Sequence, residues 1–206
     1  MGQAHHIVNM TRLREVDLHT TPHAWRKKDF PVNEVRRFLE PGPVVLLSTA
    51  WKGERNIMAM GWHMVMEFQP SLLGCFITPG NHSYEMLRRS KECVINIPTY
   101  ELIDKVVGIG NCSGENVDKF RNFELTAETA SMVDAPLIGE CYANIECRVV
   151  DTRMLKRYGL FVLEAVKAHA PTTPKYPKTI HYRGDGIFMV AGPSISRRHK
   201  FNPEML

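Results

Sequence analysis

One short segment, Gly80-Asn81-His82-Ser83, has the residue types that could hold an anion. It lies between an apolar run typical of a buried strand and the start of a helical pattern. A helix N-terminus offers unpaired backbone amides and the positive end of the helix dipole, and residues 81–83 add side-chain donors. This combination suits one phosphate group. Ordinary capping of the helix by Asn81 is the alternative interpretation, which the segment taken alone favours.

A second segment, WKGERNIMAMGW from Trp51 to Trp62, predicts two strands around a turn. Its Gly61-Trp62 pair stands where the second strand leaves the core pattern. A glycine inside a strand often marks close approach of a ligand or of another backbone. A bulge beneath a core tryptophan explains the same residues equally well.

Side chains for nucleophilic or metal chemistry form no recognisable set. Of nine histidines, four lie in the first 23 residues, and the other five show neither HExxH nor i, i+4 spacing, so we do not expect a metal site. The chain lacks GxSxG, which argues against a serine hydrolase. Cys112 is the one candidate for a reactive thiol, although a small residue in a tight loop is the favoured interpretation. No residue is therefore predicted to be catalytic.

Composition sets the class of protein. The chain has 206 residues, 44% apolar and 23% charged, enough for one domain with a full core and unlike a disordered chain. No apolar run approaches the roughly eighteen residues of a membrane span, and the N-terminus lacks the apolar centre of a secretory signal. Five cysteines without a CxxC pair argue against a disulfide framework or structural zinc. These features favour a reducing, cytoplasmic location without a membrane partner.

The positive charge is concentrated near the C-terminus. Residues 151–206 carry 10 Lys and Arg against 4 Asp and Glu, whereas the whole chain has a net charge of +4. Such a segment could attract a phosphorylated ligand, including the extra phosphate of NADPH, or nucleic acid. No nucleic-acid motif accompanies it, so we favour a solvated charged face and expect no nucleic-acid partner.

Hydrophobic periodicity predicts an α+β chain that is mainly β. Residues 1–30 read as a polar N-terminal arm. Strands are expected at 44–50, from 55, and at 72–78, 94–97, 143–149, 160–168 and 187–191, and helices at 32–39, 82–91 and 100–107. Many short strands with few helices indicate a barrel with helical insertions. The chain lacks both a βαβ rhythm and GxGxxG, which excludes a Rossmann dehydrogenase.

Four segments follow one another along the chain: WKGERNIMAMGWHMV, GNHSYEMLRRS, VINIP and SGENVDKF, with a Gly-Asp-Gly turn near residue 185. Together they resemble the flavin reductase family with the FMN-binding split β-barrel, in particular its flavoredoxin-like and ferric-reductase-like branch. The resemblance covers about residues 31–192. It places one split-barrel domain with helical insertions and a basic tail at 31–206, after the arm at 1–30.

The resemblance implies a homodimer with one FMN per subunit near the dimer interface. By position, Asn56 and a strand from 59 to 63 would line the isoalloxazine ring, residues 80–83 would hold the phosphate, and Asn96 would form the floor of the site. Residues of SGENVDKF would close over the flavin, with Lys119 balancing phosphate or ring charge unless it forms a surface ion pair with Asp118. The implied cofactor-binding residues are Asn56, Ala59, Met60, Gly61, Trp62, His63, Gly80, Asn81, His82, Ser83, Asn96, Ser113, Gly114, Lys119 and Phe120.

The same resemblance implies an oxidoreductase that moves a hydride from NADH or NADPH to FMN and then passes electrons to free flavin, iron or a partner protein. A flavoredoxin-like electron-transfer protein without its own nicotinamide turnover is the first alternative. A flavin-free barrel that binds another ligand, such as haem, is the second.

Overall fold

The computed structural model describes residues 27, 31 and 42–205, and the chain divides into two units. One unit is Phe30–Ala191, which holds the whole sheet; the other combines Met1–Asp29 with Gly192–Leu206. In the second unit, the described C-terminal segment contains two 3-10 helices, η3 (Arg198–Lys200) and η4 (Pro203–Met205). The expected arm at 1–30 and helix at 32–39 lie outside the described residues, apart from 27 and 31.

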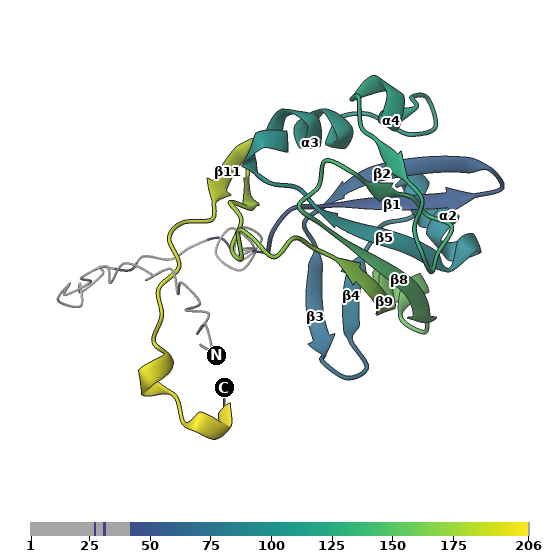
Figure 1. Cartoon of the computed structure of the whole chain (residues 1–206). Coiled ribbons are helices and arrows are strands. Elements are labelled where there is room, and N and C mark those ends of the chain that lie inside the picture. Colours follow the sequence, from purple (N-terminus) through teal and green to yellow (C-terminus); the bar gives the residue numbers. More distant parts are fainter. Residues whose placement is uncertain (1–26, 28–30, 32–41, 206) are drawn as a thin grey trace, which may run out of the picture. The chain divides into compact units, whose positions relative to one another are not determined.

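The larger unit is built on a seven-stranded antiparallel sheet with the order β2-β1-β5-β8-β9-β4-β3 (Figure 1). Its strands are β1 (Val45–Trp51), β2 (Glu54–Met60), β3 (His63–Glu67), β4 (Leu72–Phe76), β5 (Glu92–Ile97), β8 (Ala143–Asp151) and β9 (Leu160–His169). The edge strands β2 and β3 are consecutive in the chain and are joined by Gly61-Trp62. The Phe76 N–H at the end of β4 donates to the Trp62 carbonyl at 3.0 Å, which extends the β3–β4 pairing into this link.

Two hydrophobic cores lie on opposite faces of β1. Consecutive residues of this strand are apolar, so both of its faces are buried. Val45 and Leu47 belong to the core inside the barrel, whereas Leu46 belongs to a second core outside it. A strand covered on both faces reads as a continuous apolar run, which is the pattern that predicted this strand. A one-residue register shift would therefore still bury apolar side chains, and pairing with β2 and β5 sets the register.

Each core is covered by different helices. Helix α2 (His82–Ser90) places Leu87 in the inner core. Helix α3 (Ile103–Gly110) and the single turn α4 (Lys119–Asn122) place Ile109 and Phe120 in the outer core. The smaller elements are η2 (Tyr100–Leu102), α5 (Leu155–Tyr158), and the paired strands β6 (Ala127–Glu128) and β7 (Leu137–Ile138).

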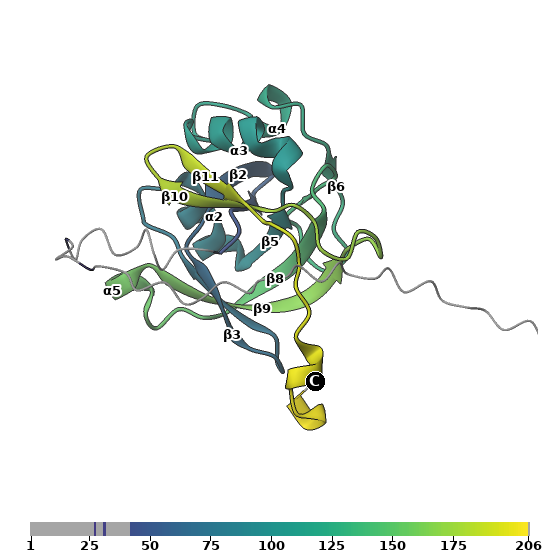
Figure 2. The same ribbon diagram turned by 90° about the vertical axis from the view of Figure 1, so that its left-hand side faces the viewer.

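A separate hairpin, β10 (Ile180–Gly184) with β11 (Ile187–Val190), lies beside α3 (Figure 2). Ile180 and Phe188 pack into the outer core, which anchors the hairpin there. Its turn needs left-handed backbone at Gly184, Asp185 and Gly186, with φ of 96°, 53° and 76°. Glycine adopts this conformation without steric cost, which explains the Gly-Asp-Gly sequence.

The structure confirms the predicted mainly β fold class, but the elements differ from the expected ones in several places, and β6, β7, α4 and α5 were not expected. The strand expected to run from 59 to 63 is interrupted, because β2 ends at Met60 and β3 begins at His63. Strand β10 was not expected; its exposed polar residues give it little apolar alternation.

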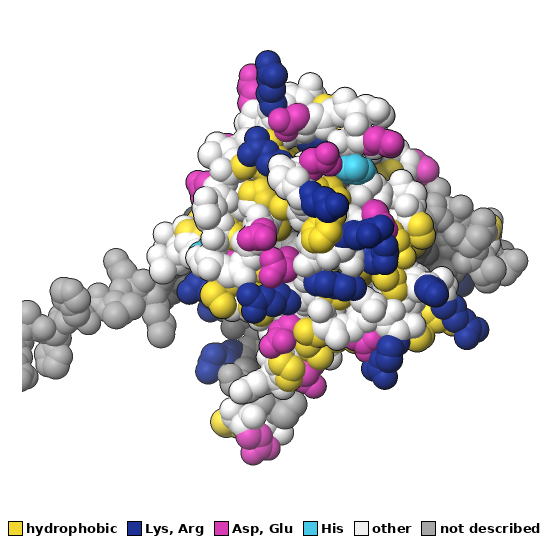
Figure 3. All heavy atoms as spheres, turned by 90° about the vertical axis from the view of Figure 1, so that its right-hand side faces the viewer, with side chains coloured by type: hydrophobic (Ala, Val, Ile, Leu, Met, Phe, Trp, Pro, Cys, Tyr) yellow, Lys and Arg dark blue, Asp and Glu magenta, His cyan; other side chains and the backbone are white. Residues whose placement is uncertain are grey.

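Charges of both signs are interspersed on the face shown in Figure 3. Surface ion pairs of the described residues include Glu85 with Arg88 at 2.7 Å and with Arg89 at 2.6 Å, all on α2. Such exposed pairs contribute little to stability. Within the part of the chain that the structure describes, no helix has the length and apolar character of a membrane span.

Candidate functional site

The predicted anion cradle lines a small cavity of about 220 Å³. Residues 80–83 form one wall and residues 110–114, between α3 and α4, form the opposite wall. Asn56 and Met58 from β2 and Lys119 at the start of α4 complete the lining. Three segments that are distant in sequence are thus brought together around one polar space.

Asn56 carries a buried polar atom without a partner. Its side chain is 3% exposed, and its Nδ2 donates to Ser83 Oγ at 2.9 Å. Its Oδ1 accepts no hydrogen bond from any residue that the structure describes. A Cβ on Gly114 would lie 1.9 Å from this oxygen, so only glycine lets the loop approach so closely. An unpaired buried oxygen is costly, and a ligand hydroxyl or N–H would remove that cost.

The N-terminus of α2 has the geometry of an anion site and lacks the expected cap. Asn81 occupies the N-cap position but makes no side-chain bond to the helix. Its Nδ2 donates instead to the carbonyl and hydroxyl of Thr78, at 3.3 and 2.8 Å. The capping interpretation of Asn81 is therefore wrong, and the first-turn amides of His82 and Ser83 have no side-chain cap.

Lys119 is a buried cation in the same cavity. Its residue is 5% exposed, and Nζ donates to the Ile109 carbonyl at 2.9 Å. Burial lowers the pKa of Lys119 below its ordinary value, and the neighbouring Cys112 partly opposes that change. The alternative of a surface ion pair with Asp118 is wrong, since Asp118 instead accepts from the Arg121 N–H as the N-cap of α4. A buried ammonium bonded to a neutral carbonyl favours an anionic ligand.

A larger cavity of about 730 Å³ adjoins the small one, because Gly110 and Asn111 line both. Its walls are largely apolar and come from the end of β2 and its link to β3, from α3, and from the β10–β11 hairpin. The lining residues are Val44, Ala59, Met60, Gly61, Trp62, Val106, Val107, Gly110, Asn111, Tyr182, Gly184, Asp185, Gly186 and Phe188. Trp62 is 57% exposed, so the proposed bulge beneath a core tryptophan is wrong.

The structure brings most of the predicted residues to these two cavities. Ala59, Met60, Gly61 and Trp62 line the larger one; Asn56, Gly80, Asn81, His82, Ser83, Ser113, Gly114 and Lys119 line the smaller one. The arrangement fits a ligand with a phosphate at one end and a flat apolar ring at the other. Direct contact of any of these residues with a cofactor stays a prediction.

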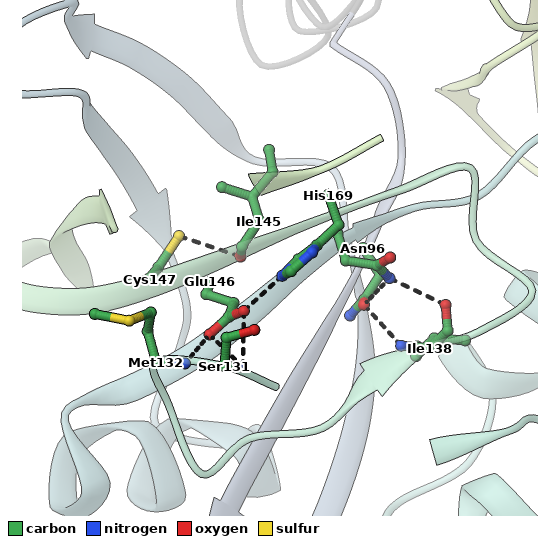
Figure 4. Close-up of polar contacts among 9 residues, drawn as sticks. Asn96, Ser131, Met132, Ile138, Ile145, Glu146, Cys147 and His169 are labelled. Carbon is green, nitrogen blue, oxygen red and sulfur yellow. Dashed lines mark hydrogen bonds and ion pairs between the residues drawn. The ribbon is translucent and has the colours of Figure 1, made fainter. Parts of the chain in front are cut away.

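Three predicted residues lie outside both linings. His63 Nε2 bonds the Pro43 carbonyl at 2.7 Å. Phe120 is buried in the outer core with the Arg55 guanidinium 4.7 Å from its ring centre. Asn96 lies within the sheet, where it receives the Ile138 N–H at 3.0 Å (Figure 4). Each of these side chains has a contact outside the two linings, and whether it also touches a cofactor stays a prediction.

Sequence analysis missed several lining residues. Gly110, Asn111, Val106, Tyr182 and Phe188 reach the site only because α3 and the β10–β11 hairpin pack against the end of β2. Periodicity marked Val106 as apolar but did not say what it faces. Cys112 was singled out for its thiol, and the structure places it in the small cavity.

Comparison with known proteins shows what this chain is similar to. The model described as "Flavin reductase like domain" matches residues 36–186. An uncharacterized protein of Archaeoglobus fulgidus is 35% identical over 53% of this chain, and the match spans 62% of that protein. Among solved structures, flavoredoxin from Methanosarcina acetivorans has a TM-score of 0.72 and 26% identity, covering 88% of this chain and 100% of that chain.

A structure described as an FMN-binding domain of flavin reductases-like enzyme, from Shewanella baltica OS155, has a TM-score of 0.69 at 24% identity, covering 81% of this chain and 95% of that chain. The two structures confirm the predicted split-barrel fold. The family model confirms a flavin as the cofactor. The chain belongs to the flavin reductase like domain family.

Proposed function

We propose that this protein is an FMN-binding oxidoreductase that accepts a hydride from NADH or NADPH and passes the electrons to free flavin, iron or a partner protein. One observation carries the proposal. A polar cavity with a buried ammonium and an unpaired Asn56 Oδ1 adjoins a larger, more apolar cavity at Gly110 and Asn111. FMN has a phosphate, a hydroxylated chain and a flat ring in that order.

In this proposal the two cavities bind different parts of FMN. The first-turn amides of α2, Ser83 and Lys119 hold the phosphate. Asn56 Oδ1 accepts from a hydroxyl of the ribityl chain, and Gly114 leaves room for that contact. The ring lies against Gly61 and the apolar walls, where a β-carbon on residue 61 would intrude.

The ring supplies the redox chemistry, and the protein orients it and tunes its surroundings. Strand β2 is an edge strand, so its outward N–H groups near Met60 are not engaged in the described sheet. Such amides stabilise negative charge on a ligand beside them. The exposed Trp62 and the half-exposed Tyr182 leave one side of the larger cavity open for a second reactant.

Two measurements test this proposal. A visible spectrum under anaerobic conditions should show bound flavin that bleaches on addition of NADH or NADPH. The variant Gly61→Val should remain folded but lose FMN binding. Normal FMN affinity in that variant would show that the ring lies elsewhere, and absence of flavin binding by the wild type would exclude the function altogether.

The second candidate is an electron-transfer flavoprotein that receives electrons from a protein donor. The similarity to flavoredoxin from Methanosarcina acetivorans, which covers that whole chain, favours it. Bound flavin that neither nucleotide bleaches, but that a protein reductant does, would support this candidate over the first.

We also propose a homodimer. Strand β3 is an edge of the sheet and carries exposed apolar side chains: Val65 within it is 65% exposed, and Phe68 just after it is 87% exposed. Exposed apolar surface of this kind marks an interaction site. Light scattering should give twice the chain mass, and the double variant Val65→Lys/Phe68→Lys should give one chain mass. A wild-type monomer would contradict the proposal.

All five cysteines are free, which supports a reducing compartment, the cytoplasm, as the location. Fractionation of cells that express the natural chain tests this, and recovery from an oxidising compartment would contradict it.

A further inference from the structure

Cys112 differs from the other four cysteines of the chain, all of which lie among the described residues. Cys75, Cys93 and Cys147 are fully buried, and Cys141 is 7% exposed. Burial raises the pKa of Cys75 and of Cys141 to about 12, and that of Cys93 well above its ordinary value. Protonated, buried thiols are inert toward reagents in solution. Cys112 is half-buried and lies in the loop between α3 and α4.

Cys112 is among the residues that line the small polar cavity. Its Sγ lies 3.9 Å from the Ile109 carbonyl, the same oxygen that receives Lys119 Nζ. The thiol and the buried ammonium therefore share one acceptor at one end of the cavity. An ammonium beside a thiol attracts negative charge, whether that charge is carried by the sulfur, by a group attached to it, or by a free anion.

An independent observation marks this cavity as a ligand site. Asn56 Oδ1 is buried and unpaired, and it faces the same loop at Gly114. The Cys112 thiol thus lies in the lining of the same cavity as the unpaired Asn56 oxygen. The cavity holds about 220 Å³, so a phosphate and an adduct on Cys112 would compete for the same space beside Lys119.

We propose that Cys112 is a modification site for small disulfides, and that its modification and occupation of the cavity by the phosphate of FMN exclude each other. The inference rests on the proposed function, because it takes the phosphate as the ligand of this cavity. Bound FMN protects the thiol, and the modified thiol prevents FMN from binding.

The reaction is thiol–disulfide exchange, and it balances without a further oxidant. The Cys112 sulfur, as thiolate, attacks one sulfur of oxidised glutathione. A bond forms between the two sulfurs while the original disulfide breaks, and the leaving glutathione thiolate takes up the proton that Cys112 lost. The attached tripeptide carries carboxylates, which compete with phosphate for Lys119. A thiol reductant reverses the exchange.

The test uses the full chain, reduced and stripped of cofactor, with oxidised glutathione as the reagent. Mass spectrometry of peptides measures the adduct at each cysteine, with and without saturating FMN. We expect the adduct at Cys112 alone. Its formation should be at least about tenfold slower with saturating FMN. After modification, FMN affinity should be at least about tenfold weaker, which equals about 1.4 kcal/mol. Riboflavin, which lacks the phosphate, should protect less than FMN.

The matched control is Cys112→Ser. Its FMN affinity, whatever its absolute value, should be the same before and after exposure to the reagent. If the reduced wild type binds FMN but its affinity does not change when Cys112 is modified, this inference is wrong and the proposed function stands. If the adduct appears on another cysteine, the inference is also wrong. If the reduced wild type binds no FMN, both fail together.

Discussion

Two regions of this protein bury polar side chains, and they satisfy them to different degrees. Glu146 on β8 is fully buried, and its carboxylate accepts from His169 Nε2 at 2.6 Å and from the backbone N–H groups of Ser131 and Met132 (Figure 4). Asn56 on β2 is 3% exposed, yet its Oδ1 has no partner among the described residues. Glu146 lies on a central strand and Asn56 on an edge strand of the same sheet, and both are buried. Burial alone therefore does not explain why only one of them has all its partners.

The difference is one of completeness. At Glu146, burial on its own would raise the pKa, but the bonds from His169, Ser131 and Met132 outweigh it and lower the pKa of the carboxyl below its ordinary value. At the small cavity, the Asn56 oxygen is unpaired and Lys119 bonds only a neutral carbonyl among the described residues. A complete network holds the fold together, whereas an incomplete one is completed by a ligand.

The largest expected effect is on stability, at the complete network. Glu146→Ala leaves two backbone N–H groups and His169 without their acceptor, and we expect a loss of about 3 kcal/mol in the free energy of unfolding. FMN affinity of the folded protein should be unchanged. Urea unfolding and FMN titration measure the two quantities. Glu85→Ala, on the exposed face of α2, is the control with little effect on either. If Glu146→Ala also lost FMN affinity, the claim that Glu146 serves the fold and not the ligand would be contradicted.

The next effect is on binding, at the incomplete network. Lys119→Met removes a buried charge that meets the phosphate, so FMN affinity should fall about 10- to 100-fold, while riboflavin affinity stays the same. Stability without cofactor should hold or rise, because no buried charge remains to be desolvated. Lys105→Met is the matched control: Lys105 Nζ also donates to a backbone carbonyl, that of Glu124 at 3.1 Å, but lies outside the cavity. Equal losses for FMN and riboflavin would contradict the phosphate assignment.

A smaller effect tests the unpaired oxygen itself. Gly114→Ala places a methyl group against Asn56 Oδ1 and should weaken FMN binding about tenfold. In an Asn56→Ala background the clash is absent, so the same substitution should cost much less. This double-mutant cycle measures the coupling between the two residues. Additive effects would mean that Gly114 acts on binding through the loop and not through Asn56.

The smallest expected effect is on pH dependence. Because the pKa of Glu146 is lowered in the folded state, its contribution to stability is complete above the unfolded value near 4.5 and declines as the pH falls below it. Unfolding free energies measured across that acidic range should decline less steeply in Glu146→Gln than in the wild type. Parallel curves for the two proteins would show that the carboxyl does not supply this dependence.

Much of the fold could be predicted from local patterns. The apolar run that became β1 and the alternation of β8 were visible because burial imposes a periodicity on the sequence. Strand β10 could not be predicted, since its neighbours supply its burial. The glycine marked the break at Gly61-Trp62, but the pairing of Trp62 with the distant Phe76 could not be predicted from local spacing.

The candidate site divides in the same way. The position of residues 80–83 before a helix allowed either a cap or an anion cradle, and the family resemblance pointed to the cradle and to Lys119. Their surroundings were not predictable: Thr78 diverts the Asn81 side chain, and the outer core holds Phe120 away from the cavities. His63 and Asn96 were expected at the site by position, and each has a hydrogen-bond partner elsewhere.

By itself, then, the amino-acid sequence determined the class of fold, the family and the segments that carry polar chemistry, because these depend on short-range spacing and on motifs. The tertiary structure alone decided which buried polar groups lack a hydrogen-bond or charged partner. Asn56, Lys119 and Cys112 meet at one cavity through strand pairing and helix packing over long sequence separations. Whether a buried polar atom has a partner is a property of that packing, and no local pattern records it.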